Sequence, residues 1–299
     1  MGTGGVVRGW LAATTLGVVL FAAVPASPVG AEDPLFLNWA ELAPSLTSGY
    51  DPTDANECKS GKIQCVDAVI REMERRFDSL LSTCDHNSMF ALAYLRTTEE
   101  YRRASVEPGF FSDPGFVNHE DAVFGRYYFE AYDNWYKRNK RDQVPPAWRV
   151  AFKASDARSA TGSGSTLLGI SAHINRDLPF VLAEIGLVKP DGSSRKPDHD
   201  KVNEFLDRVD FYQEAHDRLD PSVSGSGAPG GIHLIISWRE QAWRNAERLV
   251  NASSDAERAK VAASIEESAR LEAEALKATN SYGMFESSAT RDAWCAANN

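Results

Sequence analysis

Apolar residues recur at spacings of three and four along most of the chain beyond residue 62, which is the pattern of helices that bury one face. Residues 62–84 show it most clearly, with Val66, Val69, Ile70, Met73, Phe77, Leu80 and Leu81. The same periodicity predicts helices over residues 87–104, 147–158, 165–185, 200–219, 232–250 and 255–279. We find no stretch that alternates apolar and polar positions with β-branched enrichment, so strands are not expected. The pattern predicts an all-α, multi-helix bundle.

Two further features refine this picture. Asp113-Pro114 has the form of an N-cap followed by proline at the first helical position. The helix expected after it is unusually aromatic, with Tyr127, Tyr128, Trp135 and Tyr136. Residues 255–279 are rich in Ala, Glu, Lys and Arg with few apolar anchors, which indicates a helix on the surface.

Three segments rich in glycine and serine interrupt the helices, at residues 160–165, 189–197 and 221–231. Segments of this composition are usually flexible connectors, and this is how we interpret them. The alternative is that they act as lids over a site between helices, because functional loops often have the same composition.

The first 31 residues have the pattern of a cleaved secretory signal. Arg8 precedes an apolar run over residues 10–24, and small residues occupy positions 29–31, where a signal peptidase would cut. That run has about 15 residues, shorter than the roughly 20 that a membrane span needs. We therefore expect an exported mature chain, residues 32–299, with no membrane span. Because its composition shows no break, we expect a single helical domain.

Charge excludes some classes of partner. The chain has 42 acidic and 32 basic residues, for a formal net charge of −10. A nucleic-acid-binding protein needs a basic surface to neutralise phosphates, so this class is not expected. Electrostatic docking on anionic membranes is disfavoured for the same reason.

In an exported protein, an even number of cysteines suggests disulfides. The chain has four, and four thiols allow three connectivities. Cys58 and Cys65 flank a turn-like segment, which favours a local bridge and leaves Cys84 to pair with Cys295. Zinc is the competing use of cysteine, but no Cys-x-x-Cys spacing occurs.

The most informative segment for chemistry is residues 167–179, where His173 and Asp177 lie one helical turn apart and Pro179 should kink or end the helix. Three interpretations remain open. His173 is a core histidine satisfied by Asp177, or the pair ligates a metal, or Asp177 orients His173 as a general base.

The leading functional hypothesis is a secreted metal-dependent hydrolase with a site between helices. One divalent metal ion would be its cofactor, and it would lower the pKa of a bound water. The proposed metal ligands are His119, His173, Asp177 and Asp200. The residues assigned to catalysis are His173 and Asp177, with Asn203 for positioning and Arg126 for an anionic group of the substrate.

Two alternatives compete with the hydrolase. In one, the protein is a non-catalytic binding protein whose aromatic helix lines a pocket for a small apolar ligand. In the other, the same polar residues form a buried hydrogen-bonded network with a purely structural role. The sequence does not indicate the substrate or ligand, or the oligomeric state.

Several blocks of the chain resemble a family of bacterial helical proteins that is catalogued only as a domain of unknown function. The blocks are residues 116–131 (FVNHEDAVFGRYYFEA), 146–152 (PAWRVAF), 168–179 (LGISAHINRDLP), 199–205 (HDKVNEF) and 237–249 (SWREQAWRNAERL). The likeness covers about residues 70–250 and implies an all-α fold. The candidates that it suggests for a shared site or polar core are His119, Arg126, Trp148, His173, Asn175, Asp177, Asp200, Asn203 and Trp243.

A weaker likeness is to the secreted zinc-dependent phospholipases C, which are all-α and use a His-x-x-x-Asp pair such as His173 and Asp177 would provide. The chain departs from that family in two ways. Its expected mature N-terminus is Glu32, where the family uses a ligating tryptophan, and it has no second His-x-x-x-Asp pair.

Overall fold

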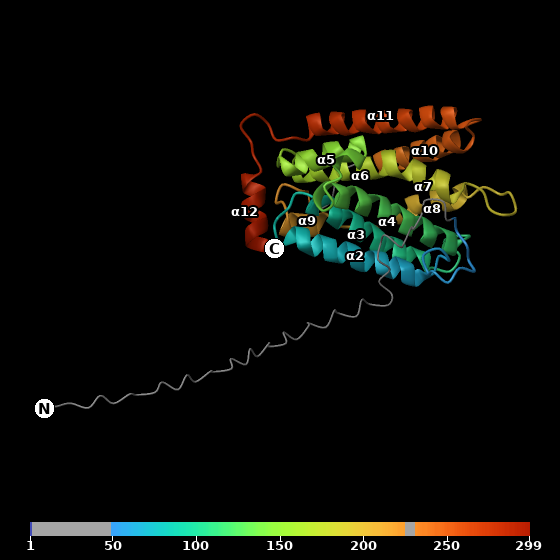
Figure 1. Ribbon diagram of the computed structural model, residues 1–299, viewed down its shortest axis with the longest axis horizontal. Coiled ribbons are helices and arrows are strands. Elements are labelled where there is room, and N and C mark those ends of the chain that lie inside the picture. The colour runs from blue at the N-terminus through green and yellow to red at the C-terminus, as the bar shows by residue number, and fades with distance from the viewer. Residues whose placement is uncertain (2–48, 225–230) are drawn as a thin grey trace. The chain divides into compact units, whose positions relative to one another are not determined.

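Each of the predicted helices is present, in whole or in parts, in a computed structural model that describes Met1, residues 49–224 and residues 231–299 (Figure 1). Among these residues there is no β-strand longer than an isolated bridge, so the all-α prediction is confirmed. The helices are α2 (Ile63–Leu81), α3 (Ser88–Ser105), α4 (Pro114–Tyr136), α5 (Pro146–Asp156), α6 (Gly162–Ser171), α7 (Leu178–Ile185), α8 (Lys196–Leu206), α9 (Tyr212–Arg218), α10 (Gly231–Val250), α11 (Asp255–Thr279) and α12 (Ala289–Asn298).

The helices form two packed groups. On one side α2 packs along α3 and α4, and on the other α11 packs along α5 while α10 packs along α7 (Figure 1). One of the contacts between the groups is made by α6 and α3, which approach closely at Gly169. A Cβ atom at this glycine would come 2.3 Å from the ring of Phe90, so a residue with a side chain could not be placed there without a shift of one helix.

Aromatic side chains fill the core between the groups. The Trp148 ring stacks on Tyr128 at 5.3 Å and on Phe152 at 5.2 Å between ring centroids, and Phe90 meets Tyr128 edge-on at 5.0 Å. Aromatic pairs at these distances contribute beyond the area that they bury. The predicted aromatic helix thus supplies core residues, whereas α11 buries only Ile265, Ala269 and Ala273, as expected of a surface helix.

The predicted helix over residues 165–185 is interrupted, as Pro179 suggested. A π-helical segment, Ala172–Asp177, separates α6 from α7, and Pro179 lies in the first turn of α7. Proline has no amide hydrogen to donate to the carbonyl four residues earlier, and a π-turn is one way to accommodate this loss. The widened turn contains His173 and Asp177.

Two predictions about element boundaries are wrong. Residues 160–165 are not a flexible connector: Thr161 caps α6 by accepting a hydrogen bond from the amide of Gly164, at 3.0 Å. Glycine is required at position 162 because a Cβ there would come 2.3 Å from the Asp220 carboxylate. Residues 200–219 form two helices, α8 and α9, and not one.

Some predictions fall outside the described residues. Apart from Met1, the structure does not describe the signal peptide expected over residues 1–31, and it does not describe residues 225–230 of the third glycine- and serine-rich segment. Helix α12, by contrast, is described and was not predicted. Within the described part of the chain, no helix combines the length and the apolar character needed to span a membrane.

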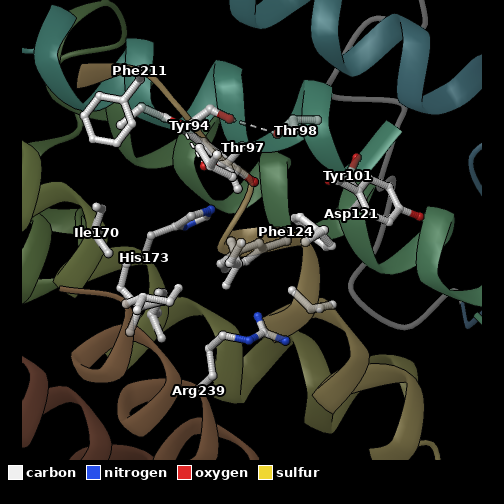
Figure 2. A pocket seen from close by; sticks show the side chains of 18 of the residues that line it. Tyr94, Thr97, Thr98, Tyr101, Asp121, Phe124, Ile170, His173, Phe211 and Arg239 are labelled. Carbon is white, nitrogen blue, oxygen red and sulfur yellow. Dashed lines mark hydrogen bonds between the residues drawn. The ribbon is translucent and has the colours of Figure 1, made fainter. Parts of the chain in front are cut away.

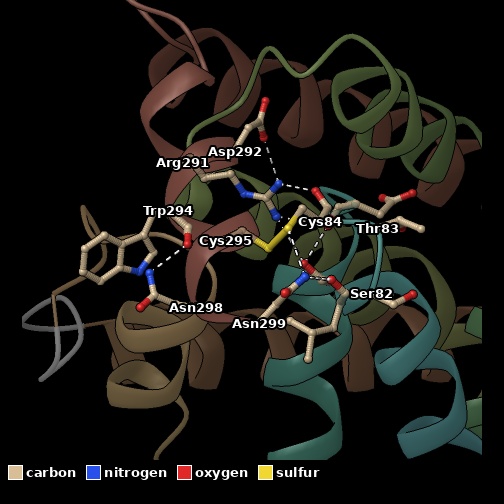
Figure 3. The surroundings of a disulfide bond; sticks show 12 residues. Ser82, Thr83, Cys84, Arg291, Asp292, Trp294, Cys295, Asn298 and Asn299 are labelled. Atoms are coloured by element: carbon tan, nitrogen blue, oxygen red, sulfur yellow. Dashed lines mark hydrogen bonds and ion pairs between the residues drawn. A yellow bond between two sulfur atoms is a disulfide. The ribbon is translucent and has the colours of Figure 1, made fainter.

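Both predicted disulfides are present, Cys58–Cys65 and Cys84–Cys295. The second joins the end of α2 to α12 across 211 residues of sequence. Beside it, the Arg291 guanidinium donates hydrogen bonds to the carbonyls of Cys84 and Asp85 (Figure 3). The C-terminal helix is thus held covalently and by buried hydrogen bonds.

We predict that replacing Cys84 and Cys295 together by serine lowers the free energy of unfolding more than replacing Cys58 and Cys65. On the chain-entropy model, the free energy of unfolding falls by about 5 kcal/mol without Cys84–Cys295 and by about 2 kcal/mol without Cys58–Cys65. The first loss is larger because that disulfide closes a much longer loop, so its removal returns more conformational entropy to the denatured chain. Urea denaturation of the two double variants measures the difference. An equal or larger loss for the local pair would contradict this account.

Candidate functional site

A cavity of about 550 Å³ lies between α3, α4, α8, α10 and the π-helical segment (Figure 2). Its walls are mainly aromatic and aliphatic, and they include Phe90, Phe124, Ile174, Leu178, Phe211 and Ile235. Ligand sites in proteins are typically of this size and apolar character, with a few polar groups that orient the ligand. The polar groups that reach this cavity therefore decide what it can bind.

His173 reaches the cavity from the π-helical segment, and Asp177 fixes its orientation. The imidazole Nδ1 lies 2.9 Å from Asp177 Oδ2, which also accepts a hydrogen bond from Trp148 Nε1 at 2.8 Å. The other carboxylate oxygen accepts from Arg176 at 3.0 Å. Because this carboxylate is an acceptor on both oxygens, Nδ1 carries the proton and donates it. The other ring nitrogen, Nε2, is left as the acceptor.

Aromatic rings hold the imidazole in place. Phe124 stacks on it almost parallel, with ring centroids 3.5 Å apart, and Tyr94 meets it edge-on at 4.6 Å. The side chain of His173 is 2% exposed, and its Nε2 has no hydrogen-bond partner among the described residues. Burial lowers the pKa of His173, so the imidazole is neutral at physiological pH.

Two more polar atoms at the cavity lack partners within the described chain. These are the hydroxyl of Tyr94, from α3, and Oδ2 of Asp121, from α4. Burial and the nearby Glu120 raise the pKa of Asp121 to about 8, and burial raises that of Glu120 to about 7. The Asp121 carboxyl is therefore mostly protonated at neutral pH and is able to donate a hydrogen bond.

Arg239 supplies the only buried cation among the described lining residues, and it enters from α10 (Figure 2). Its Nε donates to Asn203 Oδ1 at 3.0 Å and one terminal nitrogen donates to the carbonyl of His199 at 2.8 Å. Burial lowers the pKa of Arg239 to about 10, opposed by the charge of Glu120, so the guanidinium remains charged.

The structure brings together only part of the predicted site. His173 and Asp177 are in contact at the cavity, but neither His119 nor Asp200 lines it. His119 Nδ1 is bound to the carbonyl of Cys58 at 2.8 Å, and Asp200 is exposed and paired with Lys196 at 2.6 Å. Among the described residues no three of the types His, Cys, Asp and Glu are grouped closely enough to hold a metal ion. The described structure therefore does not bring the four predicted metal ligands together.

The two predicted helpers are also placed differently from the expectation. Arg126 points to Glu130 on its own helix, at 3.1 Å, and does not line the cavity. Asn203 does not line it either, but it orients Arg239, which does. Asn175 donates to Ser171 Oγ at 3.1 Å, within the π-helical region.

Sequence reasoning did not single out Tyr94, Phe124 and Arg239, which complete the site. Tyr94 and Phe124 have apolar bodies at helical spacing, so their pattern is that of ordinary core residues. One signal was present in α3, where Thr97 and Thr98 place polar groups on the face that Tyr94 and Tyr101 bury. A polar interruption of a buried face can indicate a cavity with a polar lining.

Comparison with known proteins places the chain in a family. A family model described as a family of unknown function (DUF5995) matches residues 66–279, which is more than half of the chain, and the chain belongs to this family. No curated protein and no solved structure matches it. The resemblance to an uncharacterised helical family is thereby confirmed, and the matched region contains every helix that lines the cavity.

We predict that the ionisation of Asp121 lowers stability as the pH rises from about 4 to about 8, and that Asp121→Asn removes this contribution. The folded protein keeps a proton on Asp121 up to about pH 8, whereas the unfolded chain loses it near 3.8. In this window Asp121 holds its proton in the native state and not in the unfolded chain, so its ionisation favours unfolding as the pH rises. The pKa of Glu120 is raised to about 7, so its ionisation also lowers stability as the pH rises.

Thermal unfolding at pH 5 and pH 8 measures the effect. Asp121→Asn should be more stable than the parent at pH 8 by at least about 1 kcal/mol, since one pKa unit is worth about 1.4 kcal/mol. The gain should shrink as the pH approaches 4. Identical pH dependences for the variant and the parent would show that Asp121 ionises normally.

Proposed function

We propose that this member of the DUF5995 family binds a small, neutral and largely apolar molecule in the cavity beside His173. The observation that carries the proposal is the combination of apolar walls with three buried polar atoms that have no partner within the described chain. These are His173 Nε2, the Tyr94 hydroxyl and Asp121 Oδ2. A purely structural polar network would instead be expected to satisfy its members.

The partnerless atoms indicate which groups the ligand carries. Leaving a buried polar atom unpaired costs about 1–3 kcal/mol. A ligand with an oxygen that accepts from Tyr94 or Asp121, near a hydrogen that His173 Nε2 accepts, would remove several of these penalties at once. The rest of the ligand contacts carbon atoms of the walls, so it is apolar.

The charge around the cavity favours a neutral ligand. Two exposed acidic residues, Asp207 and Asp210, are among the lining residues on the segment between α8 and α9. They repel anions, and the protein as a whole has a formal charge of −10. A cation in the cavity would meet the positive charge of Arg239, which also lines it.

We predict that N-phenyl-1-naphthylamine, a neutral apolar fluorophore, binds with one saturable site per chain and increases in fluorescence. Ile235→Trp should weaken this binding at least about tenfold, because a larger side chain at a lining position fills the cavity. Titration followed by fluorescence gives the dissociation constant.

Ile236→Trp is the matched control. Ile236 is the next residue of α10, is also half-buried and does not line the cavity, so this variant should bind the probe as the parent does. Far-ultraviolet circular dichroism establishes that both variants fold. Equal weakening by the two substitutions, or no saturable binding by the parent, would overturn the proposed function.

We also propose that the protein is exported and that a signal peptide covering residues 1–31 is removed. The support is the charge and apolar pattern of that segment, together with two disulfides that require an oxidising compartment. The absence of a membrane-spanning helix among the described residues is compatible with release.

We predict that the chain recovered from an expressing bacterial host begins at Glu32 and is found outside the cytoplasm. Replacing the apolar run over residues 10–24 by a polar one should retain the full-length chain in the cytoplasm with reduced cysteines. N-terminal sequencing and thiol counting measure both outcomes. A mature chain that still begins at Met1 outside the cytoplasm would contradict cleavage.

A further inference from the structure

We propose that the cavity is catalytic and that His173 acts in it as a general base toward a carbon acid. The substrate class is a neutral, mostly apolar ketone that has a C–H bond next to its carbonyl. This inference rests on the proposed binding function, because the substrate must enter the same cavity. It adds a reaction, the transfer of a proton between carbon and His173.

The orientation of His173 is that of a base and not only of a binding residue. Trp148 can only donate a hydrogen bond, and Arg176 likewise, so the Asp177 carboxylate between them is fixed as an acceptor. The imidazole must then present its N–H to Asp177, which leaves the lone pair of Nε2 without a partner within the described chain. A positioned carboxylate that selects this tautomer is the arrangement that general-base histidines use.

Two residues that line the cavity also carry hydrogen-bond donors that can stabilise the negative charge on the carbonyl oxygen of the substrate. The Tyr94 hydroxyl is buried without a partner, and its ring lies edge-on to the imidazole. Asp121 Oδ2 is the second partnerless oxygen, on a carboxyl that burial keeps mostly protonated at neutral pH. Neutral hydrogen-bond donors in an apolar site stabilise an enolate more strongly than they would in water.

The lining residues do not favour acyl transfer through a covalent intermediate. No serine or cysteine lines the described part of the cavity. The two threonine hydroxyls that do, Thr97 and Thr98, each donate to a carbonyl of their own helix, at 2.8 and 3.1 Å. A base without an adjacent nucleophile fits proton transfer from carbon.

The proposed step needs no other reactant. His173 Nε2 takes the proton from the carbon next to the carbonyl, and the C–H electron pair becomes the carbon–carbon double bond of the enolate. The carbonyl π electrons move to oxygen, which accepts a hydrogen bond or a proton from Tyr94 or Asp121. If a proton returns to the same carbon, the result is exchange of its hydrogen. If the proton returns to a conjugated carbon, the result is a shift of the double bond.

Three features would keep the base in position during this step. The π-helical segment places His173 at the cavity with Asp177 behind it, and such segments occur frequently at functional sites. Phe124 covers one face of the imidazole. Arg176 ties Asp177 to α11 through Glu266, at 2.7 Å.

The test uses 2-tetralone, a neutral aromatic ketone, incubated with the full-length mature protein in D2O. Nuclear magnetic resonance follows the loss of its α-hydrogen signals, after subtraction of the rate without protein. We expect saturable acceleration, and we expect His173→Gln to lose at least about 100-fold of it, the contribution typical of a general base. His86→Gln is the matched control, because His86 is also buried but pairs with Asp292 away from the cavity.

Asp177→Asn tests the positioning role with nearly unchanged side-chain volume. Because Arg176 keeps the amide oxygen as its acceptor, the NH2 group of the asparagine would take the place of Oδ2 and lose the hydrogen bond from Trp148. It would then donate to Nδ1, which would move the imidazole proton to Nε2 and remove the base. We expect kcat to fall by about 100-fold with little change in KM, and the ¹⁵N shifts of the His173 ring to report the other tautomer. A merely structural role would lower stability and leave the tautomer unchanged.

The outcomes separate this inference from the proposed function. If N-phenyl-1-naphthylamine binds and 2-tetralone displaces it, but exchange is no faster than in buffer or His173→Gln is as active as the parent, the catalytic inference is overturned and the binding function stands. His173-dependent hydrolysis of p-nitrophenyl hexanoate without ketone exchange would overturn it as well. If neither small molecule binds, both proposals fail together.

Discussion

The buried carboxylate of Asp177 is the constraint on which the site depends. It is 0% exposed, and its charge is acceptable only because Arg176, Trp148 and His173 surround it with donors. Removing a partner from such a carboxylate would leave a buried charge uncompensated, which is far more costly than losing a surface ion pair. The same contacts join three parts of the fold, the π-helical segment, α5 through Trp148, and α11 through the contact of Arg176 with Glu266.

The packing of the helices explains why a cavity is present beside a well-packed core. The stacked rings of Tyr128, Trp148 and Phe152 pack tightly in the core, and Gly169 allows α6 to approach α3 closely. On the other side, α10 is held through Arg239, which bonds to both Asn203 and the backbone of α8. The helices around the cavity are thus held by contacts with one another, so the space between them does not need to be filled to keep them in place.

The electrostatics of the cavity follow from its burial. Two neighbouring carboxyl groups on α4, Glu120 and Asp121, share an environment that disfavours charge, and their pKa values are raised to about 7 and about 8. Burial lowers the pKa of His173, so its imidazole stays neutral. The same desolvation therefore produces protonated acids and an unprotonated base within one space, the pattern by which proteins assign acid and base roles at neutral pH.

The sequence by itself determined the local properties of the protein: the helices, the interruption near Pro179, both disulfide pairings, and the facing pair of His173 and Asp177. Each of these depends on spacings of a few residues or on counting, and periodicity reports such features directly. Only the tertiary structure decided that His119 and Asp200 lie apart from that pair, and that Tyr94, Asp121 and Arg239 join it. Convergence of side chains from α3, α4 and α10 depends on how helices pack and cross, and no spacing along a single helix contains that information.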